Sequence, residues 1–206
     1  CIEIGLTPCR QIARACPPVR CPRPQGRNRR RLPQGGVAPL DPGFAEMFKA
    51  DESSANLFKN HKSVWESTKP LKDFVGRSSG FDALFYPGGH GPMYDLVYDK
   101  DSIQLIEEFY KAVTLVAAAC HGPIVCAHAK VNGEPLLMGR EVAGFAKRRR
   151  TSEAMPFLRE DELKTVGAKF ALTPQAWDAV VVEARSSLDR PRRRHMQRPI
   201  WKFHKQ

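Results

Sequence analysis

Two short apolar segments, each followed by a tight turn and separated by one amphipathic helix, constrain the fold of this chain most. Residues 82–86 (Asp-Ala-Leu-Phe-Tyr) lead into a Pro-Gly-Gly turn, and residues 114–119 (Thr-Leu-Val-Ala-Ala-Ala) lead into Cys-His-Gly-Pro. Both segments have the length and composition of buried strands. The apolar spacing between them predicts a helix over 101–112, capped by Asp101. A strand, a helix and a strand in this order predict parallel strands joined by a crossover helix.

The same alternation continues through the rest of the chain and predicts an α/β fold with helices on both faces of a parallel sheet. In such sheets the ligand site lies beyond the carboxyl ends of the strands. The 206 residues allow one ordinary domain, and without a run of about 18 apolar residues no membrane-spanning helix is expected. Further helices are predicted at 44–60, 62–70, 123–129 and 157–166, and further strands at 141–145, 168–172 and 178–182.

The net charge of +11 is concentrated in three segments that lack any helical or strand periodicity. Residues 1–33 and 185–206 carry +7 each, residues 147–150 carry +4, and the remainder carries −7. Two interpretations stay open: basic arms that bind nucleic acid or an anionic membrane, or sequence that was never selected to fold. Four of the six cysteines lie in the first segment, at spacings that fit no zinc motif, so we expect no metal site there.

The two turns carry the candidate chemistry. A cysteine on a sharp strand-to-helix turn is presented to the site, and the following helix N-terminus favours its thiolate, so Cys120 is the candidate nucleophile. Gly88 and Gly89 would let backbone N–H groups approach a ligand, as an oxyanion hole requires. His90 could line the site or have a structural role. Cys126, on the predicted helix, is expected to be a buried packing residue.

Several segments resemble the PfpI-type family of the class I glutamine-amidotransferase-like superfamily. The resemblance is carried by residues 81–96 and 118–123, with further matches at 35–42, 137–145 and 155–161, in family order. The branch it resembles most contains the glutathione-independent glyoxalase III enzymes (D-lactate dehydratases) and related stress chaperones. The resemblance implies a flavodoxin-like sheet with a nucleophile elbow.

The resemblance also implies roles for individual residues. Cys120 would be the nucleophile, His121 the acid/base, and Gly88, Gly89 and the amide of His121 would contact the substrate oxygen. The implied reaction is a carbon–oxygen lyase reaction that converts methylglyoxal to D-lactate through a cysteine hemithioacetal. Glyoxal is a further implied substrate. No cofactor, metal, specific nucleic acid or membrane is implied. A homodimer and a cytoplasmic location, with the nucleus as an alternative, are expected.

Three parts of the family pattern are missing. The branch carries a glutamate after its first strand, where this chain offers only Glu3 in a different context. An acidic run that orients the histidine is replaced by the basic residues 147–150, which leaves Glu153 as the nearest candidate carboxylate. The family's late segment is absent after residue 182. We therefore expect a sheet that is incomplete at both ends, without its first strand and helix, and an impaired activity.

A codon argument connects these losses. Residues 147–153 can be encoded so that removal of one base yields Asn-Glu-Glu-Glu, the family's acidic run. Residues 27–34 and 186–195, shifted by one base, can likewise yield sequences close to the missing strand and the missing late segment. We therefore hypothesise that the translation contains out-of-frame stretches. This gives a domain over 34–184, flanked by an atypical Pro/Cys-rich segment (1–33) and a basic tail (185–206).

Two other function classes remain open. The same fold could act as a holdase chaperone or a redox-responsive protein with an oxidisable Cys120. Alternatively, the chain could be an inactive remnant whose basic ends bind polyanions without specificity.

Overall fold

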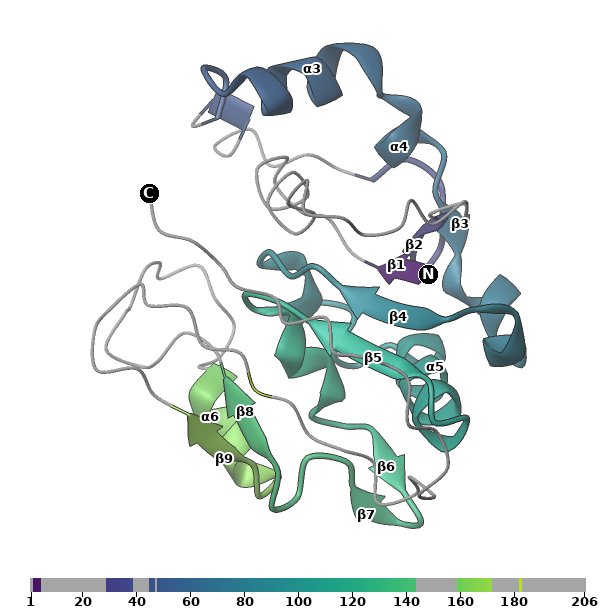
Figure 1. The fold of residues 1–206 in the computed structure, drawn as a ribbon, viewed down its shortest axis with the longest axis vertical. Helices are drawn as coiled ribbons and strands as arrows, with labels where there is room; N and C mark the ends of the chain where they lie inside the picture. The colour runs from purple at the N-terminus through teal and green to yellow at the C-terminus, as the bar shows by residue number, and fades with distance from the viewer. Residues whose placement is uncertain are drawn as a thin grey trace, which may run out of the picture.

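A five-stranded parallel sheet forms the centre of the computed structural model, which describes residues 2–4, 29–38, 45–46, 48–143, 159–171 and 182. All four pairings between neighbouring strands of this sheet are parallel. Figure 1 shows β4 and β5 side by side. The prediction of an α/β fold with a parallel sheet is therefore confirmed. In spatial order the strands are β3 (Lys69–Pro70), β2 (Arg29–Leu32), β1 (Ile2–Ile4), β4 (Ala83–Tyr86) and β5 (Leu115–Ala118).

The sheet has a central strand where the sequence analysis predicts none. Ile2 of β1 pairs with Arg29 of β2 on one side and with Leu84 of β4 on the other. Two β-branched isoleucines that alternate with a glutamate suit a short strand. The expectation that the sheet lacks its first strand is therefore wrong. The predicted strand at 178–182 and the tail at 185–206 lie outside the described residues, apart from residue 182, which has no regular structure.

Helix α5 (Lys100–Lys111) connects β4 to β5 and packs against both strands. Its N-cap is Asp99, whose Oδ1 accepts a hydrogen bond from the Ser102 backbone N–H at 2.7 Å. The predicted cap, Asp101, lies instead in the first turn. An N-cap side chain reaches the N–H group three residues further on, which is the position that Ser102 has relative to Asp99. The buried face of α5 consists of Ser102, Leu105, Ile106 and Phe109.

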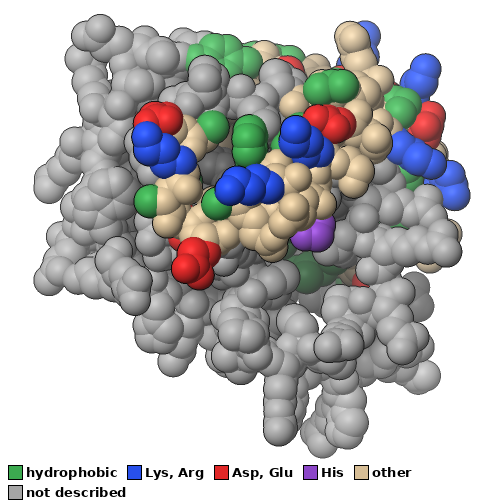
Figure 2. All heavy atoms as spheres, turned by 90° about the horizontal axis from the view of Figure 1, so that it is seen from above, with side chains coloured by type: hydrophobic (Ala, Val, Ile, Leu, Met, Phe, Trp, Pro, Cys, Tyr) green, Lys and Arg blue, Asp and Glu red, His purple; other side chains and the backbone are tan. Residues whose placement is uncertain are grey.

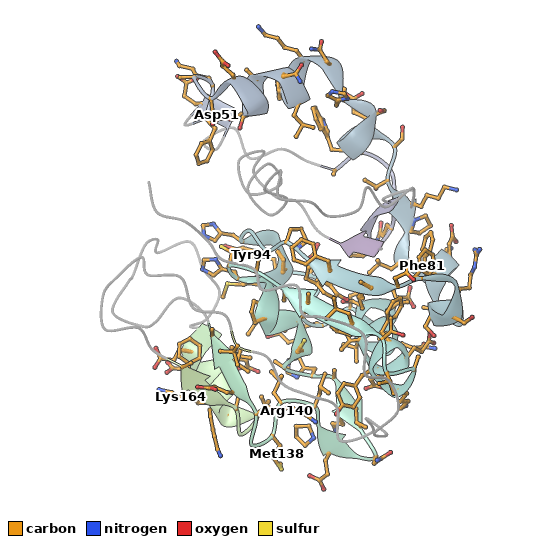
Figure 3. The ribbon with its side chains drawn as sticks, in the orientation of Figure 1. Asp51, Phe81, Tyr94, Met138, Arg140 and Lys164 are labelled. Atoms are coloured by element: carbon orange, nitrogen blue, oxygen red, sulfur yellow. The ribbon has the colours of Figure 1, made fainter. Side chains whose placement is uncertain are left out.

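The segment before β4 is less helical than its apolar spacing predicts. Helix α3 covers only Glu52–Asn60 of the predicted 44–60, because Asp51 caps it: the Ser54 N–H donates to Asp51 Oδ1 at 2.9 Å. Helix α4 is a single turn, Ser63–Glu66, and the chain then enters β3. Pro70 explains this change, since the residue before a proline disfavours the helical conformation. Figure 3 shows Asp51 at the start of α3.

Two aromatic rings pack together in this region. Trp65 is 7% exposed, and its ring stacks on that of Phe58 with centroids 5.8 Å apart. Trp65 is therefore a packing residue.

The chain after β5 departs from the predicted order. In place of the predicted helix over 123–129, a 3-10 helix, η4, covers Gly122–Cys126. An unpredicted hairpin follows, made of β6 (Lys130–Val131) and β7 (Glu134–Pro135). Strands β8 (Glu141–Ala143) and β9 (Lys169–Ala171) pair in parallel and form a separate two-stranded sheet. Helix α6 (Arg159–Thr165) lies between them in the sequence. The predicted strands at 141–145 and 168–172 therefore form, without joining the central sheet.

The described surface mixes charges of both signs. Figure 2 shows Lys and Arg side chains interspersed with Asp and Glu on the face that includes α3. Lys49 and Glu46 form an ion pair in this region. No helix among the described residues is long and apolar enough to cross a membrane. The basic segments 1–28, 147–150 and 185–206, apart from the three residues of β1, lie outside the described residues.

Candidate active site

The register between β4 and β5 brings the two predicted turns together. Tyr86, the last residue of β4, pairs with Ala118, the last residue of β5. The Ala119 N–H then donates to the Tyr86 carbonyl oxygen at 2.9 Å, which extends the strand pairing by one residue. Both turns therefore leave the sheet side by side at its carboxyl edge, where Figure 3 also places Tyr94. This is the edge at which parallel sheets place their ligand sites.

The two turns approach so closely that glycine is required in each. Gly88 has a φ of +98°, and a Cβ placed there would lie 2.4 Å from the Ala119 carbonyl oxygen and 2.9 Å from the Cys120 Cβ. A Cβ on Gly122 would lie 2.6 Å from the Tyr86 carbonyl oxygen. The Pro-Gly-Gly turn thus lies directly against the cysteine turn. Gly89, with a φ of +82°, follows in the same left-handed region.

Cys120 occupies a strained position at the head of the second turn. Its φ is +55°, a value that side chains other than glycine rarely adopt and that costs about 1–2 kcal/mol. The Gly122 N–H donates to the Ala119 carbonyl oxygen at 2.7 Å, which closes the turn around it. Cys120 is half-buried. A nucleophile held on such a turn is presented away from the sheet, as a nucleophile elbow requires.

The Cys120 thiol has an imidazole beside it. Its Sγ lies 3.3 Å from Nδ1 of His121, a residue that is only 7% exposed. This distance allows a proton to pass between sulfur and nitrogen. The helix that follows is a five-residue 3-10 helix rather than the predicted α-helix. The contribution of its dipole to the thiolate is therefore smaller than expected, because fewer peptide units are aligned.

His90 reaches the same site from the first turn. It follows Gly89 and precedes the 3-10 helix η3 (Gly91–Met93), which packs against η4. The rings of His90 and His121 are in edge-to-face contact, with centroids 5.0 Å apart and planes inclined by 77°. The structure therefore brings together Cys120, His121, Gly88 and His90 from the sequence analysis, although their roles remain predictions.

Two further residues and a metal site were considered in the sequence analysis. Glu153, the candidate third residue, lies outside the described residues. Cys126 packs against the core, and burial raises the pKa of its thiol to about 12, which agrees with its predicted packing role. Within the described ranges, no three His, Cys, Asp or Glu side chains gather in a way that could hold a metal ion.

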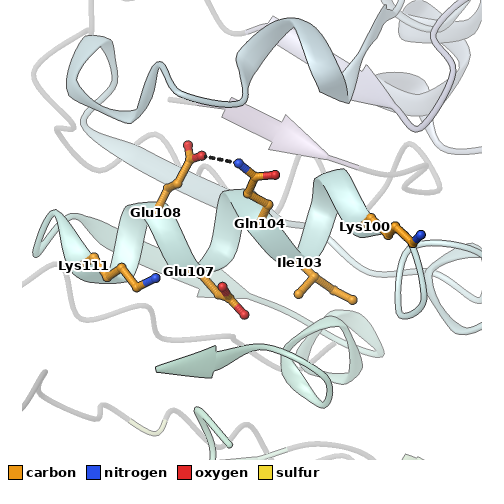
Figure 4. A pocket seen from close by; sticks show the side chains of 6 residues that line it. All are labelled: Lys100, Ile103, Gln104, Glu107, Glu108 and Lys111. Atoms are coloured by element: carbon orange, nitrogen blue, oxygen red, sulfur yellow. Dashed lines mark hydrogen bonds between the residues drawn. The ribbon is translucent and has the colours of Figure 1, made fainter. Parts of the chain in front are cut away.

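A shallow hollow along α5 lies apart from the two turns and is a second place where a ligand could bind (Figure 4). Its two carboxylates bind backbone groups of other elements: Glu108 Oε2 accepts from the Gly76 N–H at 2.8 Å, and Glu107 Oε1 accepts from the N–H of Lys130 in β6 at 2.8 Å. Both glutamates are half-buried and anchor these segments to α5, so they do not form a fully solvated helix face. The hollow is lined by Lys100, Ile103, Gln104, Glu107, Glu108 and Lys111.

Comparison with known proteins identifies the family. The model of the DJ-1/PfpI family matches residues 67–186, which is more than half of the chain. The chain belongs to the DJ-1/PfpI family. The matched range contains both turns of the candidate site and the strands that carry them.

Two curated relatives carry the names of enzymes. The chain is 29% identical over 135 residues to the "Glutathione-independent glyoxalase HSP31" of Saccharomyces cerevisiae, which covers 59% of this chain and 56% of the yeast protein. It is 31% identical over 102 residues to the "Protein/nucleic acid deglycase HchA" of Escherichia coli O157:H7, covering 48% of this chain and 36% of that protein. The chain thus matches about half or less of the length of these relatives.

A solved structure has the same fold. The crystal structure of glyoxalase III from Candida albicans superposes with a TM-score of 0.65 at 19% identity, covering 77% of this chain and 71% of that one. This likeness supports the predicted flavodoxin-like architecture. Resemblance to the PfpI-type family, inferred from the two turns, is confirmed by the family match.

Proposed function

We propose that the chain is a glutathione-independent glyoxalase III-like enzyme that converts methylglyoxal to D-lactate. The observation that carries the proposal is the 3.3 Å approach of Cys120 Sγ to His121 Nδ1 on a strained elbow, directly against Gly88. The names of the yeast and Candida relatives indicate the substrate class. The proposal needs only a small reactive aldehyde, with water as the second reactant.

The proposed reaction begins when His121 takes the proton of the Cys120 thiol. The thiolate attacks the aldehyde carbon of methylglyoxal, and the resulting alkoxide takes up a proton to give a hemithioacetal. A base then removes the remaining hydrogen of that carbon, and a proton is returned to the neighbouring carbon, which converts the hydroxyketone to a hydroxyacyl thioester. Water cleaves the thioester, which releases lactate and regenerates the thiol. Methylglyoxal and one water thus give lactate without an external oxidant or reductant.

The test is lactate formation from methylglyoxal by the purified chain in the absence of glutathione. Cys120→Ala should abolish the reaction, because no thioester can form. Cys126→Ala is the matched control, since it removes the half-buried thiol that packs against the core outside the site. Lactate formation that survives Cys120→Ala would reject the proposal, and D-lactate dehydrogenase would report which enantiomer is formed.

The name of the Escherichia coli relative favours a second candidate, the removal of glycation adducts from protein or nucleic acid. The two candidates differ in whether free aldehyde must be present. A peptide carrying early methylglyoxal adducts, freed of excess aldehyde and held with an aldehyde scavenger, separates them. Repair that continues in the scavenger indicates a deglycase, whereas repair that stops indicates consumption of released methylglyoxal.

We further propose that the activity is reduced because parts of the chain are translated out of frame. Strand β2 lies between β3 and β1, and interior strands of parallel sheets are normally apolar, yet three of its four residues are arginine. The coding DNA tests this idea directly. Another reading frame at residues 27–34 and 147–153 should yield family sequence, and its absence there would reject the idea.

A holdase or redox-responsive function remains the non-enzymatic alternative. Suppression of aggregation that persists after Cys120→Ala, in a chain that forms no lactate, would favour the holdase.

A further inference from the structure

The two histidines of the site form a contact that the proposed chemistry does not require. His90 and His121 are separated by 30 intervening positions in the sequence, yet their rings meet edge to face at 5.0 Å. The β4–β5 register and the left-handed glycines before His90 produce this meeting. An edge-to-face arrangement is one of the two that aromatic rings prefer, since the positive edge of one meets the negative face of the other.

The contact matters because of what His121 must do. Nδ1 of His121 has to stay beside the Cys120 Sγ, but a histidine can rotate about two side-chain torsions, and the second has a broad energy profile. Cys120 and His121 are neighbours on one tight turn, and their backbone geometry alone does not fix the plane of the imidazole. A ring packed against His121 from the other turn restricts that rotation.

We propose that His90 is a positioning residue that holds the imidazole of His121 with Nδ1 toward the Cys120 sulfur. The ring contact, rather than a proton on His90, performs this function. The inference rests on the proposed role of Cys120 and His121 as the reacting pair. It assigns to the turn at 87–90 a second function beyond close approach to the substrate: the turn carries the ring that orients the base.

The test measures alkylation of Cys120 by iodoacetamide, which requires no substrate. Trypsin releases both Cys120 and Cys126 in one peptide, residues 112–130, so tandem mass spectrometry compares the two thiols within the same molecule. At neutral pH the rate reports how strongly the neighbouring His121 activates the Cys120 thiol. At about pH 10 an ordinary thiol is largely ionised without help, so the rate there reports accessibility alone.

Three substitutions separate ring packing from protonation. His90→Ala and His90→Leu remove the ring and should lower the neutral-pH rate about ten-fold, with little change at pH 10. His90→Phe keeps the ring, removes the titrating nitrogens and should react nearly as fast as the wild type. His61→Ala, at an exposed residue after α3, is the control and should have no effect. Two ring-removing variants are used so that misfolding of one, seen by circular dichroism, leaves the other.

Each contrary result has a distinct meaning. Unchanged rates in folded His90→Ala or His90→Leu would overturn the positioning role. A His90→Phe rate as low as that of His90→Ala would show that the ring nitrogens matter, which also overturns it. If wild-type Cys120 reacts no faster than Cys126 at neutral pH, the reacting pair itself is absent, and the proposed function fails with the inference.

Discussion

Gly88→Ala is the substitution for which the structure gives the most specific expectation. Gly88 lies where the Pro-Gly-Gly turn touches the cysteine turn, and its φ of +98° lies in the region that favours glycine. A methyl group there would lie 2.4 Å from the Ala119 carbonyl oxygen. That oxygen belongs to the backbone, so a side-chain rotation cannot relieve the clash. Either the elbow moves or the glycine turn does.

The magnitude follows from two costs. A left-handed conformation costs a residue other than glycine about 1–2 kcal/mol, and an additional carbon in a packed site costs about 1–3 kcal/mol. Gly88→Ala should therefore lower the free energy of unfolding by about 2–5 kcal/mol. For a chain of this size, about 2–4 °C of Tm is lost per kcal/mol, so Tm should fall by roughly 4–20 °C.

The effect on the site should exceed the effect on stability. Displacement of the elbow changes the 3.3 Å separation between Cys120 Sγ and His121 Nδ1. The neutral-pH alkylation rate of Cys120 should therefore fall at temperatures at which Gly88→Ala is still fully folded. Urea unfolding followed by fluorescence gives the stability, and alkylation at 15 °C gives the state of the site.

Gly91→Ala is the matched control in the same turn. Gly91 has no positive φ, and a Cβ placed there meets nothing within 4 Å. Its stability and alkylation rate should stay near those of the wild type. If Gly88→Ala were as stable and as reactive as Gly91→Ala, the close approach of the two turns would not exist in solution, and the derived geometry of the site would be wrong.

Three further predictions concern the core and its edges. Val113 lies two residues after the end of α5 and has a φ of 55°, so Val113→Gly should raise the free energy of unfolding by about 0.5–1 kcal/mol, and a lower value in urea unfolding would contradict this. The Tyr86 hydroxyl lies 2.9 Å from Ser102 Oγ, and both residues are fully buried. Tyr86→Phe and Ser102→Ala should each lower the free energy of unfolding by about 1–2 kcal/mol. The double variant should lose about 0.5–1.5 kcal/mol less than the sum of the two single losses, and strictly additive losses would refute the hydrogen bond between the two side chains. Burial raises the pKa of Cys126 to about 12, so above pH 9 the unfolded thiol ionises while the folded one does not. The free energy of unfolding should therefore fall between pH 9 and 12, by about 1.4 kcal/mol at pH 10, and this fall should be absent in Cys126→Ala. Parallel pH profiles of the wild type and Cys126→Ala would contradict this expectation.

The sequence predicts the elements around the site well because their signals are local. Residues 82–86 and 114–119 are apolar runs bounded by turn residues, and the structure places β4 and β5 within one or two residues of them. The helix between them is predicted from its apolar spacing, and only its cap is wrong, because Asp99 and Asp101 both offer a capping side chain. These strand–turn junctions are predictable because each strand is a short apolar run that ends at turn residues, although β5 is only partly buried.

The elements that the sequence does not predict are strand β2 and the β6–β7 hairpin. Strand β2 contains Arg29, Arg30 and Arg31, a composition that does not indicate a strand, and its partners come from elsewhere in the chain. The β6–β7 hairpin, in contrast, has a local signal in the sequence. Asn132 and Gly133 both have positive φ values, and Asn-Gly is the dipeptide most typical of such turns.

The contact between His90 and His121 could not be predicted from either turn alone, since it depends on the β4–β5 register. That contact also limits where a third catalytic group can lie. For Nδ1 of His121 to accept the Cys120 proton, the neutral imidazole must carry its hydrogen on Nε2. A carboxylate that orients this ring must therefore approach Nε2 without displacing the ring of His90 from its contact with the imidazole. Any candidate for the third role, Glu153 included, has to satisfy that geometry as well as carry the right charge, because an acid placed elsewhere would stabilise neither the tautomer nor the imidazolium.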